Sequence, residues 1–407
     1  MRILFVTELW PPHGGSFILD QVKAIAPFVS ATVAVLAPHP PGFSRYRNRR
    51  FRFGDKPAAP ELTDDIPVYY LCYRTIPELG KYLNSIQAFR ALARFLRHHR
   101  ERFDLIHAHF AYTAGFAAVR AGRSLGLPAI VTAYGSDINV YAKRTPKNLV
   151  AASFTIWGLR HATALTALSH DLATKIETLG VSGRKITVIP LGISETTFFP
   201  RGDKSTLRRQ LQLPDNGHLF LFVGNWVPVK GLTFLFEALA QVCQKLPTAQ
   251  LVMIGHGVLE SFLQQQAQQL GIAKKIIWAG PKAHAEIPLW MSAADFLVLP
   301  SLSEGYGLVV LEALACGTPV IASRVGGIPE ILVSSDFGIM VPPRNSEALA
   351  QAILDAAGKN WDQTKLAAYA RANTWSERAQ RFLKVYQNVI ENTAVTNRPS
   401  DLGPRTS

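Results

Sequence analysis

Two acidic residues flank a glycine-rich loop in the second half of the chain. The loop reads Glu304-Gly305-Tyr306-Gly307-Leu308, and Glu312 follows Glu304 by eight residues. An apolar run ends just before the loop and a helix is expected to begin near Gly307, where unobstructed backbone N–H groups form an anion site that suits a diphosphate. The carboxylates lie more than one helical turn apart, so they can contact different parts of one extended ligand. Their acceptor-only oxygens suit sugar and ribose hydroxyls.

A lysine follows an earlier apolar run in the same half. Gly224-Asn225 leads to Lys230, which opens an expected helix. Because a cation at a helix N-terminus is mildly unfavourable, its presence there favours a role in holding an anion over a solvated surface lysine. If the two glutamates are considered alone, an alternative is that Glu304 is an ordinary charge at a helix N-terminus and Glu312 a solvated helix residue.

Further candidates follow apolar runs in the first half of the chain. Gly14 and Gly15 allow the backbone to approach a ligand closely, although a tight turn explains a lone glycine pair better. His109 fits a satisfied strand-end histidine better than a metal ligand. Tyr134 and Asp137 come after the next run, where Asp137 either binds a substrate hydroxyl or caps the following segment.

Short apolar, β-branched runs alternate with helix-length segments along the chain. The expected strands of the first half are Arg2–Thr7, Thr32–Ala37, Val68–Tyr73, Asp104–His107, Ala129–Ala133, Ala164–Ala167 and Ile186–Pro190. Those of the second half are His218–Gly224, Gln250–Ile254, Ile276–Ala279, Phe296–Leu299, Pro319–Ala322 and Gly338–Val341. Continuous apolar strands between helices predict buried parallel sheets, and two such series predict two doubly wound, Rossmann-like units.

The domain boundaries follow from the same pattern. We expect a first domain over 1–195, a linker over 196–215 rich in turn-forming and charged residues, and a second domain over 216–375. An amphipathic helix over 376–391 is expected to cross back to the first domain, and 392–407 to form a loose polar tail.

The motifs together resemble those of the retaining glycosyltransferases of family 4, which have the GT-B fold of two Rossmann-like domains facing a cleft. The stretch from Glu304 to Glu312 is similar to the family's EX7E signature. Four further stretches match in chain order, namely 222–231, 254–257, 278–295 and 323–330. Such an ordered series is far more specific than any single motif.

The resemblance implies a role for each matched residue. Glu304 would contact hydroxyls of the donor sugar, Glu312 the ribose, and Lys230 the diphosphate, whose charge builds as the glycosidic bond breaks. The other expected donor-side residues are Gly14, Gly15, Gly224, Asn225, Gly255, Pro281, Gly305, Tyr306, Gly307 and Leu308. Tyr134, Asp137 and His109 are expected on the acceptor side, in the first domain. Asp137 joins Glu304 and Lys230 as an expected catalytic residue.

The family retains the anomeric configuration, usually without a metal, and the sequence has no Asp-x-Asp motif. We therefore expect neither a metal nor a cofactor. Since no carboxylate nucleophile stands out, we expect a same-face displacement in which the departing diphosphate helps to deprotonate the acceptor. Two positions depart from the family pattern. Asn225 replaces a common arginine and removes a bidentate phosphate contact, and Tyr134 replaces a common histidine.

The formal net charge is +14, which indicates an acidic partner. Half of that excess lies between Pro41 and Phe103, with 13 Lys/Arg against 6 Asp/Glu. Arg45–Phe53 interleaves arginine with aromatic residues, and Asn84–Phe103 has the pattern of a basic amphipathic helix. Both segments suit anionic lipid headgroups. The alternative is that the basic residues form the solvated face of an ordinary Rossmann helix. Nucleic acid is a less favoured partner.

Three widely spaced cysteines, Cys72, Cys243 and Cys316, show neither a disulfide framework nor metal-ligand spacing, which favours a reducing compartment. The first residues do not have the pattern of a signal peptide, and no apolar stretch approaches the roughly 18 residues of a spanning helix. We therefore expect a cytoplasmic protein, with any membrane contact made peripherally on the inner face of the cytoplasmic membrane.

The resemblance implies transfer of a sugar from a nucleotide-diphosphate sugar, with a UDP-sugar as the first choice because UDP is the commonest donor nucleotide in the family. The expected acceptor is a saccharide or a lipid-linked acceptor in cell-envelope or exopolysaccharide biosynthesis. A nucleotide-sugar epimerase of the same fold would consume the donor without an acceptor. A non-catalytic basic protein would bind membrane or nucleic acid with steep salt dependence and ignore nucleotides. Glu304, Lys230 and Glu312 argue against that last alternative.

Overall fold

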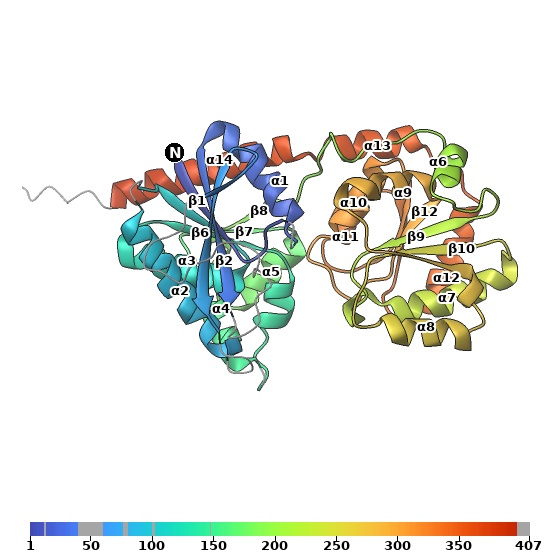
Figure 1. The fold of residues 1–407 in the computed structure, drawn as a ribbon, viewed down its shortest axis with the longest axis horizontal. Helices are drawn as coiled ribbons and strands as arrows, with labels where there is room; N and C mark the ends of the chain where they lie inside the picture. Colours follow the sequence, from blue (N-terminus) through green and yellow to red (C-terminus); the bar gives the residue numbers. More distant parts are fainter. Residues whose placement is uncertain (12–13, 40–59, 76–79, 100–101, 147, 397–407) are drawn as a thin grey trace, which may run out of the picture. The chain divides into compact units, whose positions relative to one another are not determined.

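The computed structural model describes residues 1–11, 14–39, 60–75, 80–99, 102–146 and 148–396. Contacts divide the chain into two compact units, Met1–Pro190 with Arg378–Ser407, and Leu191–Glu377. Each unit has one sheet between two layers of helices (Figure 1). The architecture is therefore the pair of parallel-sheet α/β units that the sequence pattern predicted.

The first unit is built on an eight-stranded sheet in the order β3-β4-β2-β1-β5-β6-β7-β8. Its strands are β1 (Arg2–Thr7), β2 (Ser30–His39), β3 (Glu61–Thr63), β4 (Ile66–Arg74), β5 (Leu105–His109), β6 (Ala129–Ala133), β7 (Ala164–Ala167) and β8 (Ile186–Val188). Neighbouring strands run parallel, except that β3 pairs antiparallel with β4. β3 was not among the predicted strands because its three residues lack an apolar run and none is fully buried.

Helices cover both faces of this sheet (Figure 1). They are α1 (Ser16–Ile25), α2 (Gly80–His98), α3 (Phe116–Leu125), α4 (Leu149–His161), α5 (His170–Thr178) and the returning part of α14 (Trp375–Thr396), with short helical turns η1 (Ala26–Phe28), η2 (Ala111–Gly115), η3 (Asp137–Tyr141) and η4 (Gly183–Lys185). Side chains alternate along β1, so Ile3 and Phe5 pack in one cluster with α1 and α14. Leu4 and Val6 are equally buried on the opposite face. Burial on both faces explains why the strands appear as continuous apolar runs.

The final helix returns to the first unit. Tyr386 on α14 places its hydroxyl 2.7 Å from Nδ1 of His107 on β5, and both side chains are fully buried. Arg381 donates from Nη2 to the carbonyl oxygen of Val188 at 2.6 Å. The amphipathic pattern of 376–391 therefore lies within α14, which continues to Thr396.

The second unit has a six-stranded, fully parallel sheet in the order β11-β10-β9-β12-β13-β14. The strands are β9 (Leu219–Val223), β10 (Gln250–Ile254), β11 (Ile276–Gly280), β12 (Phe296–Leu299), β13 (Val320–Ser323) and β14 (Gly338–Val341). The helices are α6 (Lys204–Gln210), α7 (Leu232–Lys245), α8 (Glu260–Gln269), α9 (Ile287–Ala293), α10 (Leu308–Ala315), α11 (Ile328–Ile331), α12 (Ser346–Ala357) and α13 (Gln363–Arg371), with turns η5 (Pro228–Lys230), η6 (Ala273–Lys275) and η7 (His284–Glu286). In Figure 1, α7, α8 and α12 lie on one face of the sheet and α6, α9, α10 and α13 on the other.

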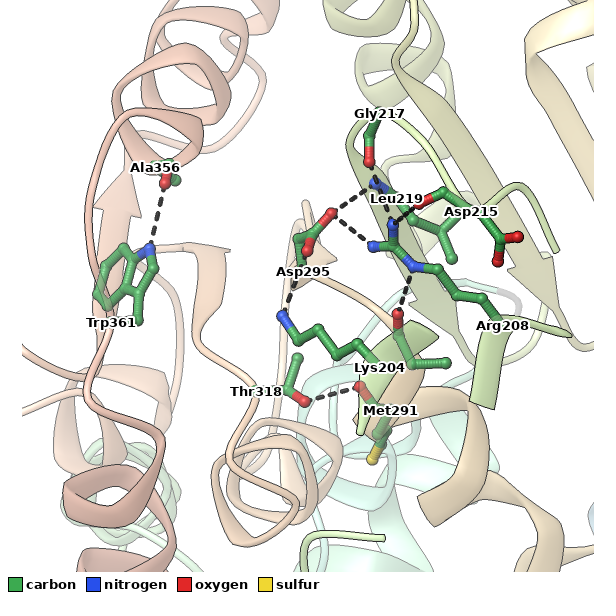
Figure 2. A network of polar contacts seen from close by, with 11 residues as sticks. Lys204, Arg208, Asp215, Gly217, Leu219, Met291, Asp295, Thr318, Ala356 and Trp361 are labelled. Carbon is green, nitrogen blue, oxygen red and sulfur yellow. Dashed lines mark hydrogen bonds and ion pairs between the residues drawn. The ribbon is translucent and has the colours of Figure 1, made fainter. Parts of the chain in front are cut away.

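A helix forms inside the range expected to be a linker. Asp203 caps α6 by accepting from the Thr206 N–H, and Arg208 on that helix is only 6% exposed. Its guanidinium bonds Asp295 at 2.8 Å and the carbonyl oxygens of Ala293 and Gly217, as Figure 2 shows for Asp295 and Gly217. Burial alone would raise the pKa of Asp295, but Lys204, the Leu219 N–H and Arg208 together lower it. This network fixes α6 to the second unit.

Part of the predicted basic surface is visible in the first unit. Arg45–Phe53 lies outside the described residues, whereas Asn84 to His98 forms most of α2. Leu92 and Phe95 are buried under this helix while its arginines are exposed, which is the ordinary burial pattern of a helix on a sheet. None of the described helices combines the length and the apolar character needed to cross a bilayer.

Candidate functional site

The second unit places two predicted residues across the point where its strand order reverses. β9 and β12 are neighbours, while the chain continues outward from β9 to β10 and from β12 to β13. In open α/β sheets, ligands bind beyond the carboxyl ends of the strands at such a switch point. Lys230 comes from the turn after β9, and Glu304 comes from the loop after β12.

The two side chains form an ion pair although 74 residues separate them. Lys230 Nζ lies 2.6 Å from Glu304 Oε1, and the side chains are 21% and 12% exposed. The hydroxyl of Ser301 donates to the same carboxylate oxygen at 2.7 Å. The pair therefore holds one cation and one carboxylate at fixed positions beside the sheet edge, a suitable arrangement for binding a phosphate and a hydroxyl together. Sequence reasoning did not select Ser301, although it lies only three residues before Glu304.

The helix after this loop presents its N-terminus at the same edge. Gly307 occupies the N-cap of α10 with φ +91°, and no side chain caps the helix. The first N–H groups of α10 are therefore not used by a capping side chain, which is the condition for anion binding at a helix N-terminus. Tyr306 is buried and Leu308 is half-buried beside the cap.

Glycine permits the loops at this edge to touch backbone to backbone. A Cβ at Gly326, with φ +55°, would overlap the carbonyl oxygen of Glu304. A Cβ at Gly255, with φ +130°, would overlap the carbonyl oxygen of Gly224. The loops after β13 and β10 therefore support the loops that carry Glu304 and Asn225.

Glu312 has a different partner from Glu304. It lies on α10 with its side chain 11% exposed, and its Oε1 is 3.3 Å from Nε2 of His284. Each glutamate thus has its own surroundings, as two contacts along an extended ligand require. His284 was not selected from the sequence, although it lies inside the matching 278–295 stretch. Asn225 and Pro281, also expected on the donor side, are exposed.

In the first unit, the glycine pair begins a helix. Gly15 has φ +80° and occupies the N-cap of α1, and Gly14 has φ +107°. A Cβ at Gly15 would lie 2.7 Å from the carbonyl oxygen of Leu9. The position therefore favours glycine over other residues for two reasons, the positive φ and the lack of space for a side chain.

Asp137 is committed to backbone contacts. Its Oδ2 accepts from Ala111 N at 2.8 Å, and its Oδ1 accepts from Gly135 N at 2.8 Å and from Ile138 N at 3.1 Å. The Tyr134 N–H lies 3.1 and 3.2 Å from the two oxygens. Burial raises the pKa of Asp137, and these four N–H groups oppose that rise. The contacts favour the capping alternative over the catalytic role that the resemblance implied.

His109, at the end of β5, and Tyr134, directly after β6, are joined by a hydrogen bond. The His109 Nδ1 to Tyr134 hydroxyl distance is 2.7 Å, and His107 stacks on His109 with ring centroids 4.6 Å apart. Burial, with a contribution from His107, lowers the pKa of His109 well below its usual range. His109 is therefore neutral and packed, but only its Nδ1 is bonded, because its buried Nε2 has no hydrogen-bond partner among the described residues.

The first unit also has a cavity, of about 450 Å³, at its own switch point between β1 and β5. Its described lining comprises Glu8, Leu9, Asn84, Phe110, Tyr112, Thr113, Ser136, Asp137, Tyr141, Asn148 and Ala151. Burial raises the pKa of Glu8 to about 8, and a hydrogen bond with Thr113 opposes the rise. Of this lining only Asp137 was predicted as a site residue. Glu8 could have been found as the acidic residue that directly follows the first strand.

Comparison with known families places this geometry in a class of enzymes. The protein family described as "Glycosyl transferase 4-like domain" matches residues 16–192, and the family described as "Glycosyl transferases group 1" matches residues 203–373. The two matches cover the two Rossmann-like units in order. The chain is thus a GT-B glycosyltransferase, a transferase that moves glycosyl groups.

Individual relatives support the family assignment. The chain is 32% identical over 367 residues to the protein named "Putative teichuronic acid biosynthesis glycosyltransferase TuaC" of Bacillus subtilis, covering 87% of this chain and 88% of the relative. It is 30% identical over 321 residues to the D-inositol 3-phosphate glycosyltransferase of Stackebrandtia nassauensis, covering 74% and 72%. The chain belongs to the family 4 type of GT-B glycosyltransferases.

Solved structures share the fold at lower identity. Sucrose-phosphate synthase of Thermosynechococcus elongatus matches with a TM-score of 0.78 and 21% identity, covering 96% of this chain and all of that one. HepE of Anabaena, solved in complex with UDP, matches with a TM-score of 0.71 and 22% identity, covering 95% and 100%.

Proposed function

We propose that the protein is a retaining glycosyltransferase that transfers a sugar from a UDP-sugar to a saccharide or lipid-linked acceptor in cell-envelope or exopolysaccharide biosynthesis. The observation that carries the proposal is the Lys230–Glu304 pair, 2.6 Å apart across the switch point of the second unit. The name of a relative, which refers to teichuronic acid biosynthesis, supports the pathway class, and the UDP bound to HepE supports the nucleotide.

The paired residues have complementary tasks in the proposed reaction. The Lys230 ammonium has three donors and one positive charge, so it can hold Glu304 and also bond a diphosphate oxygen. The uncapped N-terminus of α10 adds backbone N–H groups for the same diphosphate. Glu304 then accepts from hydroxyls of the donor sugar, while Glu312, with His284 behind it, accepts from the ribose.

In the transfer step, the bond between the anomeric carbon and the acceptor oxygen forms as the bond to the diphosphate oxygen breaks. Both events take place on one face of the sugar, which retains the anomeric configuration. The proton of the acceptor hydroxyl passes to the departing diphosphate. Lys230 stabilises the negative charge that develops on this leaving group, where a pre-positioned cation is most effective.

The test is a thermal-shift panel with UDP, GDP, ADP and CDP on the native protein and on Glu312→Ala. A ligand present at about 100 times its Kd stabilises the folded state by roughly 2.7 kcal/mol. For a unit of this size that is a rise in Tm of about 5–10 °C. We expect the shift with UDP and its loss in Glu312→Ala.

The matched control is Asp355→Ala, which removes an exposed carboxylate from the last turn of α12 and should keep the shift. A larger shift with another nucleotide would replace UDP in the proposal. No shift with any nucleotide would overturn the donor site. Consumption of a UDP-sugar to an isomer, with no acceptor present, would favour an epimerase instead.

A further inference from the structure

The cavity of the first unit is built from strained backbone. Phe110 has φ +72° and Thr113 has φ +50°, although neither is glycine. Such conformations are energetically costly for residues with a Cβ and concentrate at functional sites. Here the strained segment after β5 brings Thr113 to Glu8 across the β1/β5 switch point, where the two side chains form a hydrogen bond.

Two aromatic rings form one wall. Tyr112, next to Thr113, stacks on Tyr141 with ring centroids 4.5 Å apart and an interplanar angle of 12°. Both line the cavity, and Tyr141 is 39% exposed. Burial, followed by Glu8 and Tyr141, raises the pKa of Tyr112 to about 12, so its hydroxyl stays protonated. The stacked pair combines an apolar surface with two hydroxyl groups, which suits a ring that has both apolar and hydroxyl-bearing faces.

Apart from Asp137, whose carboxylate is bonded to backbone N–H groups, the polar groups of the described lining are neutral donors and acceptors. Asn84 lines the cavity, and its buried Oδ1 has no hydrogen-bond partner among the described residues. Asn148 and Ser136 add an amide and a hydroxyl. With its raised pKa, the Glu8 carboxyl is protonated at neutral pH and can donate as well as accept.

The described lining offers an anionic ligand no positive charge. Lysine and arginine are absent from the described lining, which contains the carboxyl groups of Glu8 and Asp137. An anionic ligand would lose water in this cavity without gaining a compensating cation among the described lining residues, and burying an unpaired charge is unfavourable. An uncharged ring with hydroxyl groups can bond to the neutral donors and acceptors of the lining without burying an unpaired charge.

We propose that this cavity binds the acceptor as an uncharged sugar ring, with Tyr112 and Tyr141 as the stacking surface and Glu8 and Asn84 as the residues that select hydroxyl groups. The inference rests on the proposed function, because it names the class of acceptor for that transfer. It assigns Glu8 to substrate selection and leaves the donor site of the second unit unchanged.

Saturation-transfer NMR tests the proposal with methyl glycosides of glucose, galactose, mannose and N-acetylglucosamine, and with the corresponding sugar phosphates. We expect transfer from the native protein to at least one neutral glycoside and little to the phosphates. Ser136→Trp, which adds a large side chain at an exposed position of the lining, should abolish the signal. Tyr112→Ala should weaken it by roughly fivefold, since an aromatic contact is lost.

Control variants and the donor readout keep the result interpretable. Ser153→Trp, exposed on α4 and outside the lining, should retain glycoside binding. Stronger binding of the sugar phosphates, neutral binding that survives Ser136→Trp, or no binding of any glycoside at millimolar concentration would each overturn the inference. A UDP thermal shift measured on the same samples separates the two proposals. If it persists without glycoside binding, only the inference fails. If it is absent too, the proposed function fails.

Discussion

Replacing Asp137 with asparagine separates a structural role from a catalytic one. Asparagine preserves the shape of the side chain but turns one acceptor oxygen into an NH₂ donor. The carboxylate receives four backbone N–H groups, from Ala111, Tyr134, Gly135 and Ile138. If the amide oxygen takes the side with three donors, its NH₂ faces the Ala111 N–H, and two donors then point at each other.

The expected cost follows from these contacts. A hydrogen bond to a charged group contributes about 1.5–3 kcal/mol, and a buried donor left without an acceptor costs about 1–3 kcal/mol. The three remaining bonds weaken because their acceptor loses its charge, whereas the neutral amide avoids part of the burial cost that raises the pKa of Asp137. The balance is a loss of about 3 kcal/mol, or roughly 6–12 °C in Tm for a domain of 150–250 residues.

The assay is thermal unfolding by circular dichroism on the native protein and Asp137→Asn, together with UDP-sugar turnover measured below both transitions. Asp171→Asn is the matched control, because its carboxylate forms a half-exposed i,i+4 pair with Lys175, and such a pair contributes only about 0.3–0.5 kcal/mol. Unchanged Tm with abolished turnover would refute the capping role. It would support the catalytic role that the family resemblance implies for Asp137.

Three further perturbations test other parts of the structure. Arg208→Met removes the buried guanidinium that bonds Asp295 and three carbonyl oxygens, and should lower the free energy of unfolding by about 3 kcal/mol in urea titrations; a loss below about 1 kcal/mol would contradict a structural role for α6. Burial lowers the pKa of His107 to about 3, so the stability that neutral His107 contributes is complete above pH 6.5 and is lost as pH falls toward 3. The urea midpoint of unfolding should therefore change more between pH 7 and pH 5 in the native protein than in His107→Gln. Equal changes in the two proteins would contradict this prediction. Gly326→Ala should weaken the UDP thermal shift, because the added Cβ displaces the Glu304 loop. Gly271→Ala is the control and should preserve the shift, because Gly271 also has positive φ (+69°) but has open space for a Cβ. Equal shifts in the two variants would show that Gly326 does not support the Glu304 loop.

Local sequence pattern predicted most of the fold. Apolar runs such as Ala129–Ala133 and Phe296–Leu299 coincide with β6 and β12, because a strand buried on both faces must be apolar at consecutive positions. β3 escaped this reasoning since it is a short, exposed edge strand. It is joined to β4 through Asp64 and Asp65, which both have positive φ, and such a turn has weaker sequence signals than a glycine turn.

The sequence by itself determined the two parallel sheets, the family, and the loops in which Lys230, Glu304 and Glu312 lie, because burial period and motif spacing are local properties of the chain. Only the tertiary structure decided which of these groups meet. Lys230 reaches Glu304, and Glu8 reaches Thr113, because parallel strands bring distant loops to one sheet edge. The motif left Asp137 open between a substrate contact and a cap. The backbone N–H groups around it became visible only in the folded structure, because their directions depend on the path of the chain and not on residue type.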